Sequence, residues 1–287
     1  MTDAALPTFS ILIATYNAAD TLAACLASIA AQDMEGWEIL VADGASQDGT
    51  GRILAEFAGQ IAYSVSRRDE GPYDAWNSLL PHARGRWIMF LGADDRLASI
   101  DTLSALARHC ETLPQRTPDL SYVFGMTEFV AGCEVIERFG QNSLPGDRQD
   151  PAADFALSHT GLLHHRDLFD RFGPFSVRYA IAGDAHFMLR SLRDPETRFY
   201  HAPVTVARMA AGGLSSGVRS RVTCYREVEA ARRELAIEPA RPPWLRSLQR
   251  RSAWAERIHA LLGERALLFV ANAYRRMTGR PARRHYR

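Results

Sequence analysis

The first hundred residues alternate between short apolar runs and segments whose apolar positions recur with a helical spacing. The runs are rich in isoleucine, leucine and valine and too short for helices, which is typical of buried strands; they lie at residues 9–14, 37–42, 61–66 and 87–91. Strands and helices that alternate in this way predict an α/β fold with a mostly parallel central sheet flanked by helices. Beyond residue 101 the alternation weakens, and residues 155–172 are predicted to be a helix.

Polar residues follow the predicted strands at their carboxyl ends. Right-handed crossovers bring these ends to one edge of a parallel sheet, where ligands of open α/β sheets bind. The residues gathered there are Thr15, Asn17, Asp43, Arg67, Arg68, Asp94 and Asp95. The pattern therefore predicts a polar ligand site at this edge.

Asp94 and Asp95 are adjacent carboxylates directly behind a predicted buried strand. Because their negative charges repel each other, the pair is not explained by a contribution to the stability of the fold. An oxygen-ligated Mg²⁺ or Mn²⁺ would offset this repulsion and would hold a phosphate group as well. The alternative is a helix N-cap, where aspartate is favoured. We favour the metal, because strand ends of open sheets are where ligands bind.

Asp43 ends a strand predicted near the middle of the sheet, and two interpretations of it are equally open. Its carboxylate could accept hydrogen bonds from a ribose hydroxyl or a base N–H, or it could form an Asx turn into Gly44. Among known motifs, GxGxxG, GxxxxGK[ST] and GxSxG are all missing from the sequence. A hydride-transferring Rossmann enzyme, a P-loop ATPase and a serine hydrolase are therefore disfavoured.

Five segments in order resemble the second glycosyltransferase family, whose members use nucleotide-sugars and have the GT-A fold. SILIATYNAADTLAACLASIAAQ resembles the opening strand, turn and helix, and EILVADGASQDGT resembles the loop that follows the second strand. DEGPYDAWNSLLPHARGRWIMFLGADD resembles the donor-side and acidic metal-binding motifs. HTGLLHHRDLFDRFGPFSVRYAIAGDAHFMLRSL and AGGLSS resemble the acceptor half and its end. The resemblance covers about residues 8–216 and is strongest to bacterial transferases that build exopolysaccharide or lipopolysaccharide.

This resemblance implies a GT-A catalytic domain at residues 1–216, with a nucleotide-sugar half at about 8–100 and an acceptor half at 101–216. Residues 217–287 would be a helical, basic C-terminal extension. The implied reaction is inverting transfer of a sugar from a nucleotide-sugar, typically a UDP-sugar, to a hydroxyl of a glycan or polyprenyl-linked acceptor.

The resemblance also implies roles for individual residues. Contacts with the nucleotide-sugar fall on Thr15, Asn17, Asp43, Arg68, Asp69, Asp74, Asn77, Asp94 and His159. Asp94 and Asp95 would hold Mn²⁺ or Mg²⁺ on the diphosphate, and Asp184 matches the catalytic carboxylate.

Inverting transfer needs a base beside the acceptor hydroxyl and a cation on the departing diphosphate, and Asp184 and Asp94 can supply these roles from two halves. From the residues alone, Asp184 could also be a helix cap, and only the resemblance favours the base. His159 is as readily a buried, hydrogen-bonded histidine as a phosphate or metal contact. Two positions depart from the family pattern. Gly92 stands where many relatives have the first acid of D-x-D, and His186 where relatives often have a second acid.

The charge is unevenly distributed along the chain. The net charge is +1, and all 34 basic residues are arginines. Residues 241–287 hold 12 arginines and two glutamates, and residues 244–274 mix arginines with large apolar side chains. Such a segment either lies on an anionic bilayer, which would suit a polyprenyl-linked acceptor, or packs on the body with its arginines in solvent. Both readings stay open, and neither indicates a nucleic-acid partner.

The cysteine pattern and the first residues predict a cytoplasmic protein. The four cysteines are scattered without a CxxC pair, which favours reduced thiols, and the sequence begins with no signal-peptide pattern. The alternative location is the inner face of the cytoplasmic membrane, as a peripheral protein. Two rival functions stay open: a sugar-nucleotide nucleotidyltransferase on a similar sheet, and a non-catalytic nucleotide-sugar-binding protein.

Overall fold

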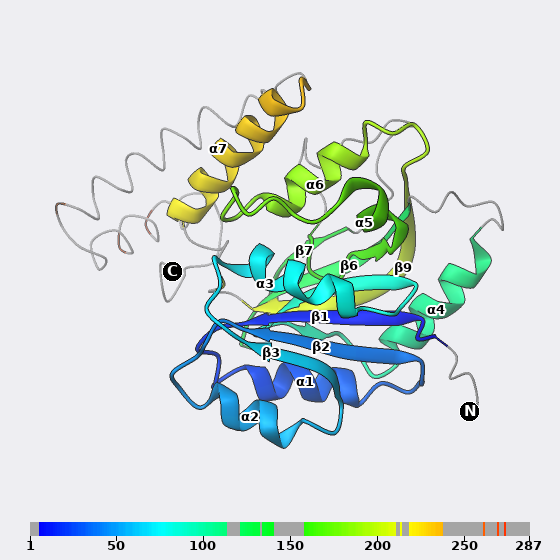
Figure 1. The fold of residues 1–287 in the computed structure, drawn as a ribbon, viewed down its shortest axis with the longest axis vertical. Helices are drawn as coiled ribbons and strands as arrows, with labels where there is room; N and C mark the ends of the chain where they lie inside the picture. The colour runs from blue at the N-terminus through cyan, green and yellow to red at the C-terminus, as the bar shows by residue number, and fades with distance from the viewer. Residues whose placement is uncertain are drawn as a thin grey trace. The chain divides into compact units, whose positions relative to one another are not determined.

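The computed structural model describes residues 6–113, 121–132, 134–140, 158–210, 213, 218–237, 261, 269 and 273 (Figure 1). Its strands are β1 (Phe9–Thr15), β2 (Trp37–Asp43), β3 (Ile61–Ser66), β4 (Trp87–Gly92), β5 (Arg96–Leu97), β6 (Ser121–Ala131), β7 (Glu134–Phe139), β8 (Leu163–His165) and β9 (Arg198–Ala210). Its helices are α1 (Leu22–Ala30), α2 (Thr50–Glu56), α3 (Pro72–Leu79), α4 (Thr102–Thr112), α5 (Asp167–Phe172), α6 (Gly183–Ser191) and α7 (Val218–Glu234).

The described strands form one mixed sheet in the order β3-β2-β1-β4-β8-β6-β9-β5, with β7 paired to β6. β3, β2, β1 and β4 are parallel neighbours. β8 runs antiparallel to both β4 and β6. The register of β1 against β2 pairs Thr15 with Asp43, so the polar residues behind these strands lie at one edge, as the sequence predicts.

Two apolar cores cover the two faces of the sheet, because successive side chains of a strand point to opposite faces. Ile11 and Ile13 of β1 pack into a core with α1, α2 and α4, whereas Leu12 packs into the core that includes α3, α5 and α6. Figure 1 shows α1 and α2 on one side of the strands and α3 on the other. The predicted α/β class with helices on both faces is confirmed.

The single helix predicted over residues 155–172 is wrong. Residues 158–162 are not helical, β8 follows, and only α5 at the end of this segment is a helix. The reason is tertiary: Leu163 of β8 pairs with Met89 of β4 on one side and with Val123 of β6 on the other. A backbone inserted between two strands must pair with both, and that requirement overrides the local helical spacing.

The chain divides into two compact units, Met1–Ala211 and Gly212–Arg287, and α7 belongs to the second. The predicted domain boundary at residue 216 stays a prediction. The AGGLSS motif, apart from Gly213, and nearly all of residues 244–274 lie outside the described residues. Within the ranges that the structure describes, no helix has the length and apolarity needed to cross a bilayer.

Candidate functional site

A cleft of about 470 Å³ opens among the loops that follow β1, β2 and β3. It is lined by Tyr16, Gly44, Ala45, Gln47, Arg68 and Asp69. Tyr16 is 65% exposed, so its ring is open to a flat ligand. The Tyr16 ring and Asp69 Oδ2 lie so near Gly44 that a side chain there would come within 3.1 and 3.0 Å of them. The cleft therefore lies at the edge where the sequence predicts a ligand.

Asn17 ties the β1 loop to the β2 loop. Its backbone N–H donates to Ser46 Oγ at 2.8 Å, and its Oδ1 accepts from the backbone N–H of Gln47 at 2.9 Å. Its φ of +46° lies in a region that asparagine tolerates better than most residues. Thr15 lies beside it with a buried Oγ1 that has no hydrogen-bond partner among the described residues. Contacts of both residues with a donor stay predictions.

Asp43 is buried at the end of β2 and accepts hydrogen bonds from two serines. The backbone N–H of Ser46 donates to its carboxylate, in the manner of an Asx turn, and Ser66 Oγ donates to Oδ2 at 2.6 Å. The side-chain hydroxyl of Ser46 donates to Oδ1. The structure therefore contains the Asx turn, and a contact of Asp43 with a nucleoside stays a prediction.

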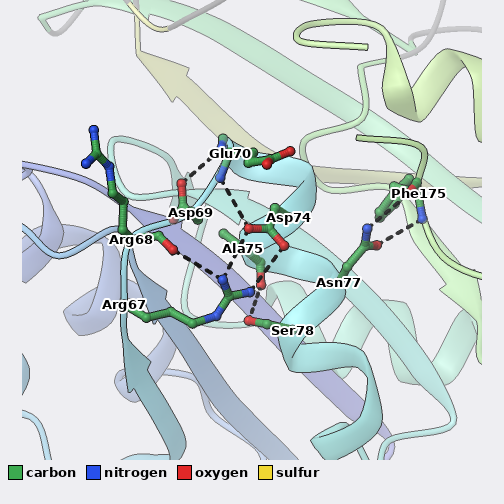
Figure 2. A network of polar contacts seen from close by, with 10 residues as sticks. Arg67, Arg68, Asp69, Glu70, Asp74, Ala75, Asn77, Ser78 and Phe175 are labelled. Carbon is green, nitrogen blue, oxygen red and sulfur yellow. Dashed lines mark hydrogen bonds and ion pairs between the residues drawn. The ribbon is translucent and has the colours of Figure 1, made fainter. Parts of the chain in front are cut away.

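Figure 2 shows a polar network at the start of α3. The two terminal guanidinium nitrogens of Arg67 donate to Asp74 at 3.3 and 3.2 Å, and the backbone N–H of Glu70 donates to the same carboxylate at 3.2 Å. The hydrogen bond from Arg67 holds the pKa of Asp74 below its ordinary value. Arg68 points away from this network (Figure 2) and lines the cleft together with Asp69. Asp74 thus positions the loop, while Arg68 and Asp69 face the cleft.

Asn77 connects α3 to the loop that precedes α6. Its Nδ2 donates to the Phe175 carbonyl and its Oδ1 accepts from the Phe175 N–H, each at 2.9 Å (Figure 2). This reciprocal pair uses both ends of the amide, much as a neighbouring strand would. A contact between Asn77 and the donor, which the family resemblance implies, stays a prediction.

Replacing Asn77 by alanine should therefore reduce stability and leave nucleotide binding unchanged. The change leaves two backbone groups of Phe175 without partners, so we expect the free energy of unfolding to fall by about 2–3 kcal/mol in urea titrations. Ser78→Ala is the matched control on the same helix, since the Ser78 hydroxyl donates only locally, to the Ala75 carbonyl at 2.7 Å. Weaker UDP binding by Asn77→Ala in calorimetry, at unchanged stability, would instead place Asn77 in the donor site.

Asp95 is 4% exposed and contacts Thr160, which lies in the predicted acceptor half. Its Oδ2 accepts from the Gly92 N–H and from Thr160 Oγ1, each at 3.1 Å, and its Oδ1 has no partner among the described residues. Burial, together with the charge of Asp94, raises the pKa of Asp95 to about 7. Burial also raises the pKa of Asp94. The two carboxyl groups are thus close together and poorly solvated, a situation that a bound cation relieves.

The carboxylates of Asp94 and Asp95 are suitable ligands for a divalent cation. Carboxylate oxygens are the ligands that Mg²⁺ and Mn²⁺ prefer, and the unpartnered Oδ1 of Asp95 has capacity for one more contact. A Cβ at Gly92 would lie 2.8 Å from Asp94 Oδ1 and 3.1 Å from Asp95 Oδ2, so the carboxylates fill the space of the missing family acid. The described part of the chain holds no group of three or more His, Cys, Asp or Glu that could bind a metal. A cation here would take further ligands from diphosphate and water.

Asp184 lies in the first turn of α6, where the helix dipole favours a negative charge. The N-cap of this helix is Ala182, so Asp184 is not the capping residue. Its Oδ1 accepts a hydrogen bond of 2.9 Å from the Tyr73 hydroxyl of α3, and the same hydroxyl lies 2.6 Å from the Ile181 carbonyl oxygen. Tyr73, which lies in the predicted nucleotide-sugar half, therefore holds the predicted catalytic carboxylate.

His159 and Thr160 connect the two acidic sites. Thr160 donates to Asp95, and His159 lies near enough to Asp184 to feel its charge. Burial lowers the pKa of His159, and the neighbouring carboxylate only partly opposes this effect. The imidazole stacks on Phe90 with ring centroids 5.3 Å apart, and its Nε2 has no partner within the described ranges. His159 is a largely buried aromatic ring beside the site, and its contact with a donor stays a prediction.

The structure adds four residues that the sequence did not single out for the site. Tyr16 and Gln47 line the cleft, Tyr73 bonds Asp184, and Thr160 bonds Asp95. All four residues stand inside the motifs quoted above, so motif membership was the available signal. The contact of Thr160 with Asp95 had no local signal, because the two residues are 65 positions apart.

Comparisons with known proteins identify the family. Residues 10–126 match the family model of glycosyl transferase family 2. A PGL/p-HBAD biosynthesis glycosyltransferase of Mycobacterium bovis is 34% identical over 223 residues, which are 75% of this chain and 81% of the relative. The Escherichia coli UDP-Glc:alpha-D-GlcNAc-diphosphoundecaprenol beta-1,3-glucosyltransferase WfgD is 29% identical over 188 residues, or 64% of this chain and 70% of WfgD.

Solved structures share the fold. Staphylococcus aureus TarS 1–349 in complex with UDP-GlcNAc gives a TM-score of 0.62 at 20% identity, over 78% of this chain and 66% of that form of TarS. The mannosyltransferase PcManGT of Pyrobaculum calidifontis, in complex with GDP-Man and Mn²⁺, gives a TM-score of 0.57 at 20% identity, over 97% of this chain and 79% of the PcManGT chain. These neighbours confirm the predicted GT-A type of α/β fold, and the sequence relatives are glycosyltransferases. The chain belongs to glycosyl transferase family 2.

Proposed function

We propose that this glycosyltransferase moves a sugar from a UDP-sugar, with inversion, to a hydroxyl of a glycan or lipid-linked acceptor. The observation that carries the proposal is that both acidic sites act on one short segment: Thr160 bonds Asp95, and the charge of Asp184 acts on the pKa of the adjacent His159. A leaving-group site and a base must flank the same reacting carbon, which requires such closeness.

The cleft suits the nucleoside of the donor. The exposed Tyr16 ring can stack on a base, and Gln47 and Asp69 supply polar groups at the same opening. UDP is favoured over other nucleotides because WfgD is named for UDP-Glc and TarS was solved with UDP-GlcNAc. The GDP-Man of PcManGT makes GDP the natural comparison in a binding test.

Asp184 acts as the general base in the proposed mechanism. Its carboxylate takes the proton of the acceptor hydroxyl while that oxygen attacks the anomeric carbon from the face opposite the diphosphate. The new C–O bond forms as the bond from the anomeric carbon to the diphosphate oxygen breaks, so the configuration inverts and UDP leaves with the bonding electrons. A positioned base of this kind contributes about 10²–10⁴ to the rate.

Asp94 and Asp95 are the residues that would hold Mn²⁺ or Mg²⁺. Such an ion, when bound, neutralises charge that develops on the leaving diphosphate. Asp94 makes no hydrogen bond to the side chain of another described residue, which leaves its carboxylate open to a ligand. Asp95 also maintains the contact with Thr160. The Mn²⁺ of PcManGT supports this assignment for a relative of the same fold.

A lipid-linked acceptor is supported by the printed acceptor of WfgD, a sugar on diphosphoundecaprenol. Such a lipid places the reaction at the cytoplasmic face of a membrane, and the arginine-rich residues 244–274 offer a contact with anionic headgroups. Family membership removes support from the nucleotidyltransferase alternative. Sugar transfer or donor hydrolysis by the purified protein would exclude the alternative of a non-catalytic nucleotide-sugar-binding protein.

The test is a thermal-unfolding series with UDP-glucose, UDP-GlcNAc, UDP-galactose and GDP-mannose, each with and without Mn²⁺. We expect a rise in Tm that needs both a UDP-sugar and the metal; ligand at a hundredfold above its Kd adds about 2.7 kcal/mol. The donor that binds is then incubated with the enzyme, and NMR of the released sugar reports inversion. A response to GDP-mannose alone would overturn the UDP assignment, and no response to any donor would overturn the function.

A further inference from the structure

We infer that Tyr73 is a positioning residue that aims the Asp184 carboxylate at the acceptor hydroxyl. This inference rests on the proposed role of Asp184 as the base. A carboxylate in the first turn of a helix can rotate, whereas a general base must present one oxygen to the acceptor hydroxyl. The Tyr73 hydroxyl bonds Oδ1 at 2.9 Å, while no described residue donates to Oδ2. Oδ2 is therefore the oxygen that takes the proton.

The Tyr73 ring is itself fixed by its surroundings. A Cβ at Gly183 would lie 2.8 to 3.0 Å from three carbons of the ring, so the backbone at the start of α6 packs directly against it. Trp76 and Phe175 contact the ring with centroids 5.7 and 5.6 Å away. The side chain is 6% exposed. The hydroxyl therefore has little freedom to move away from Asp184.

The Tyr73 hydroxyl has one proton, and within the described ranges two acceptors lie near it: the Ile181 carbonyl oxygen at 2.6 Å and Asp184 Oδ1 at 2.9 Å. While Asp184 is ionised, the hydrogen bond to it is assisted by charge and is the stronger of the two. After Oδ2 has taken the acceptor proton, Oδ1 becomes a weaker acceptor, and the phenol O–H can turn to the Ile181 carbonyl. The phenol keeps its proton throughout, so the acceptor proton ends on Asp184. Rotation of the Tyr73 hydroxyl about its C–O bond therefore accommodates both the ionised and the protonated form of Asp184.

Tyr73→Phe removes this hydroxyl and keeps the ring, so it tests the inference directly. The probe is release of UDP from UDP-glucose with Mn²⁺, with water as the acceptor. We expect kcat to fall 10- to 100-fold while the Kd for UDP-glucose stays at the wild-type value. Tyr63→Phe is the matched control, because Tyr63 lies on β3 and stacks on His82 away from Asp184. Each variant is assayed at the same interval below its own Tm, so that a change in stability does not imitate a change in kcat.

A double variant separates this inference from the proposed function. If Tyr73 acts through Asp184, Tyr73→Phe combined with Asp184→Asn should be no slower than Asp184→Asn alone. Wild-type turnover by Asp184→Asn would overturn the proposed base, whatever Tyr73 does. Loss of turnover in Asp184→Asn together with unchanged kcat in Tyr73→Phe would overturn the role of Tyr73 only. A Tyr73→Phe effect confined to Tm or to the Kd for donor would equally reject the positioning role.

Discussion

Asp184→Asn should lower the rate of UDP release from UDP-glucose about a thousandfold, in the middle of the range for loss of a general base. Asparagine keeps an oxygen that can accept the Tyr73 hydrogen bond, so α6 and its contact with α3 should persist. It removes the ability to take a proton at neutral pH. The measurement is kcat with Mn²⁺ present, beside calorimetry of UDP-glucose, for which we expect an unchanged Kd.

The matched control for this change is Asp170→Asn. Asp170 is an exposed acid in the first turn of the neighbouring helix α5, so it shares the charge and helix position of Asp184 without the Tyr73 contact. We expect wild-type kcat from this variant. Full turnover by Asp184→Asn, or an equal loss in both variants, would contradict the assignment of Asp184 as the base.

Asp94→Asn should lower kcat at least a hundredfold and abolish the rise in Tm that Mn²⁺ and UDP produce together. The reason is electrostatic, because a cation on the leaving diphosphate contributes several kcal/mol to stabilisation of the transition state. The amide of asparagine is neutral and is a poorer ligand for Mg²⁺ and Mn²⁺ than a carboxylate. The measurements are kcat and Tm across a Mn²⁺ titration.

Two further variants make this prediction specific. Asp95→Asn retains an oxygen that can accept from Gly92 and Thr160, so its fold should persist and its loss of kcat should be smaller than that of Asp94→Asn. Asp33→Asn removes an exposed acid that follows α1 and should behave as wild type. A Mn²⁺ response in Asp94→Asn equal to that of the wild type would remove Asp94 from the metal site.

The parallel half of the fold could be predicted because its information is local. Each strand from β1 to β4 is an apolar run ended by polar residues, and the connecting helices carry their own apolar spacing. The carboxyl edge then follows from general rules of sheet topology. The sequence also identified Arg68 and Asp69 of the cleft lining.

The second half could not be predicted in the same way, because its structure depends on distant partners. β8 has three residues and no strand pattern of its own; it is a strand because β4 and β6 leave a place between them. The Tyr73 and Asp184 side chains meet across 111 positions of sequence. Asn77 bonds a backbone rather than a side chain, so residue types gave no indication of its partner.

The contacts that Tyr73, Asn77 and Asp95 make beyond residue 158 limit how this enzyme can be recombined with its relatives. A hybrid that joins residues 8–100 of this chain to the second half of a relative keeps Tyr73, Asn77 and Asp95, and each of these side chains needs a matching partner in the foreign half. The foreign half must bring a glycine in place of Gly183, since any side chain there collides with the Tyr73 ring. It must also bring a hydroxyl in place of Thr160 to bond Asp95. New acceptor preferences are therefore more easily installed by grafting surface loops than by exchanging whole halves.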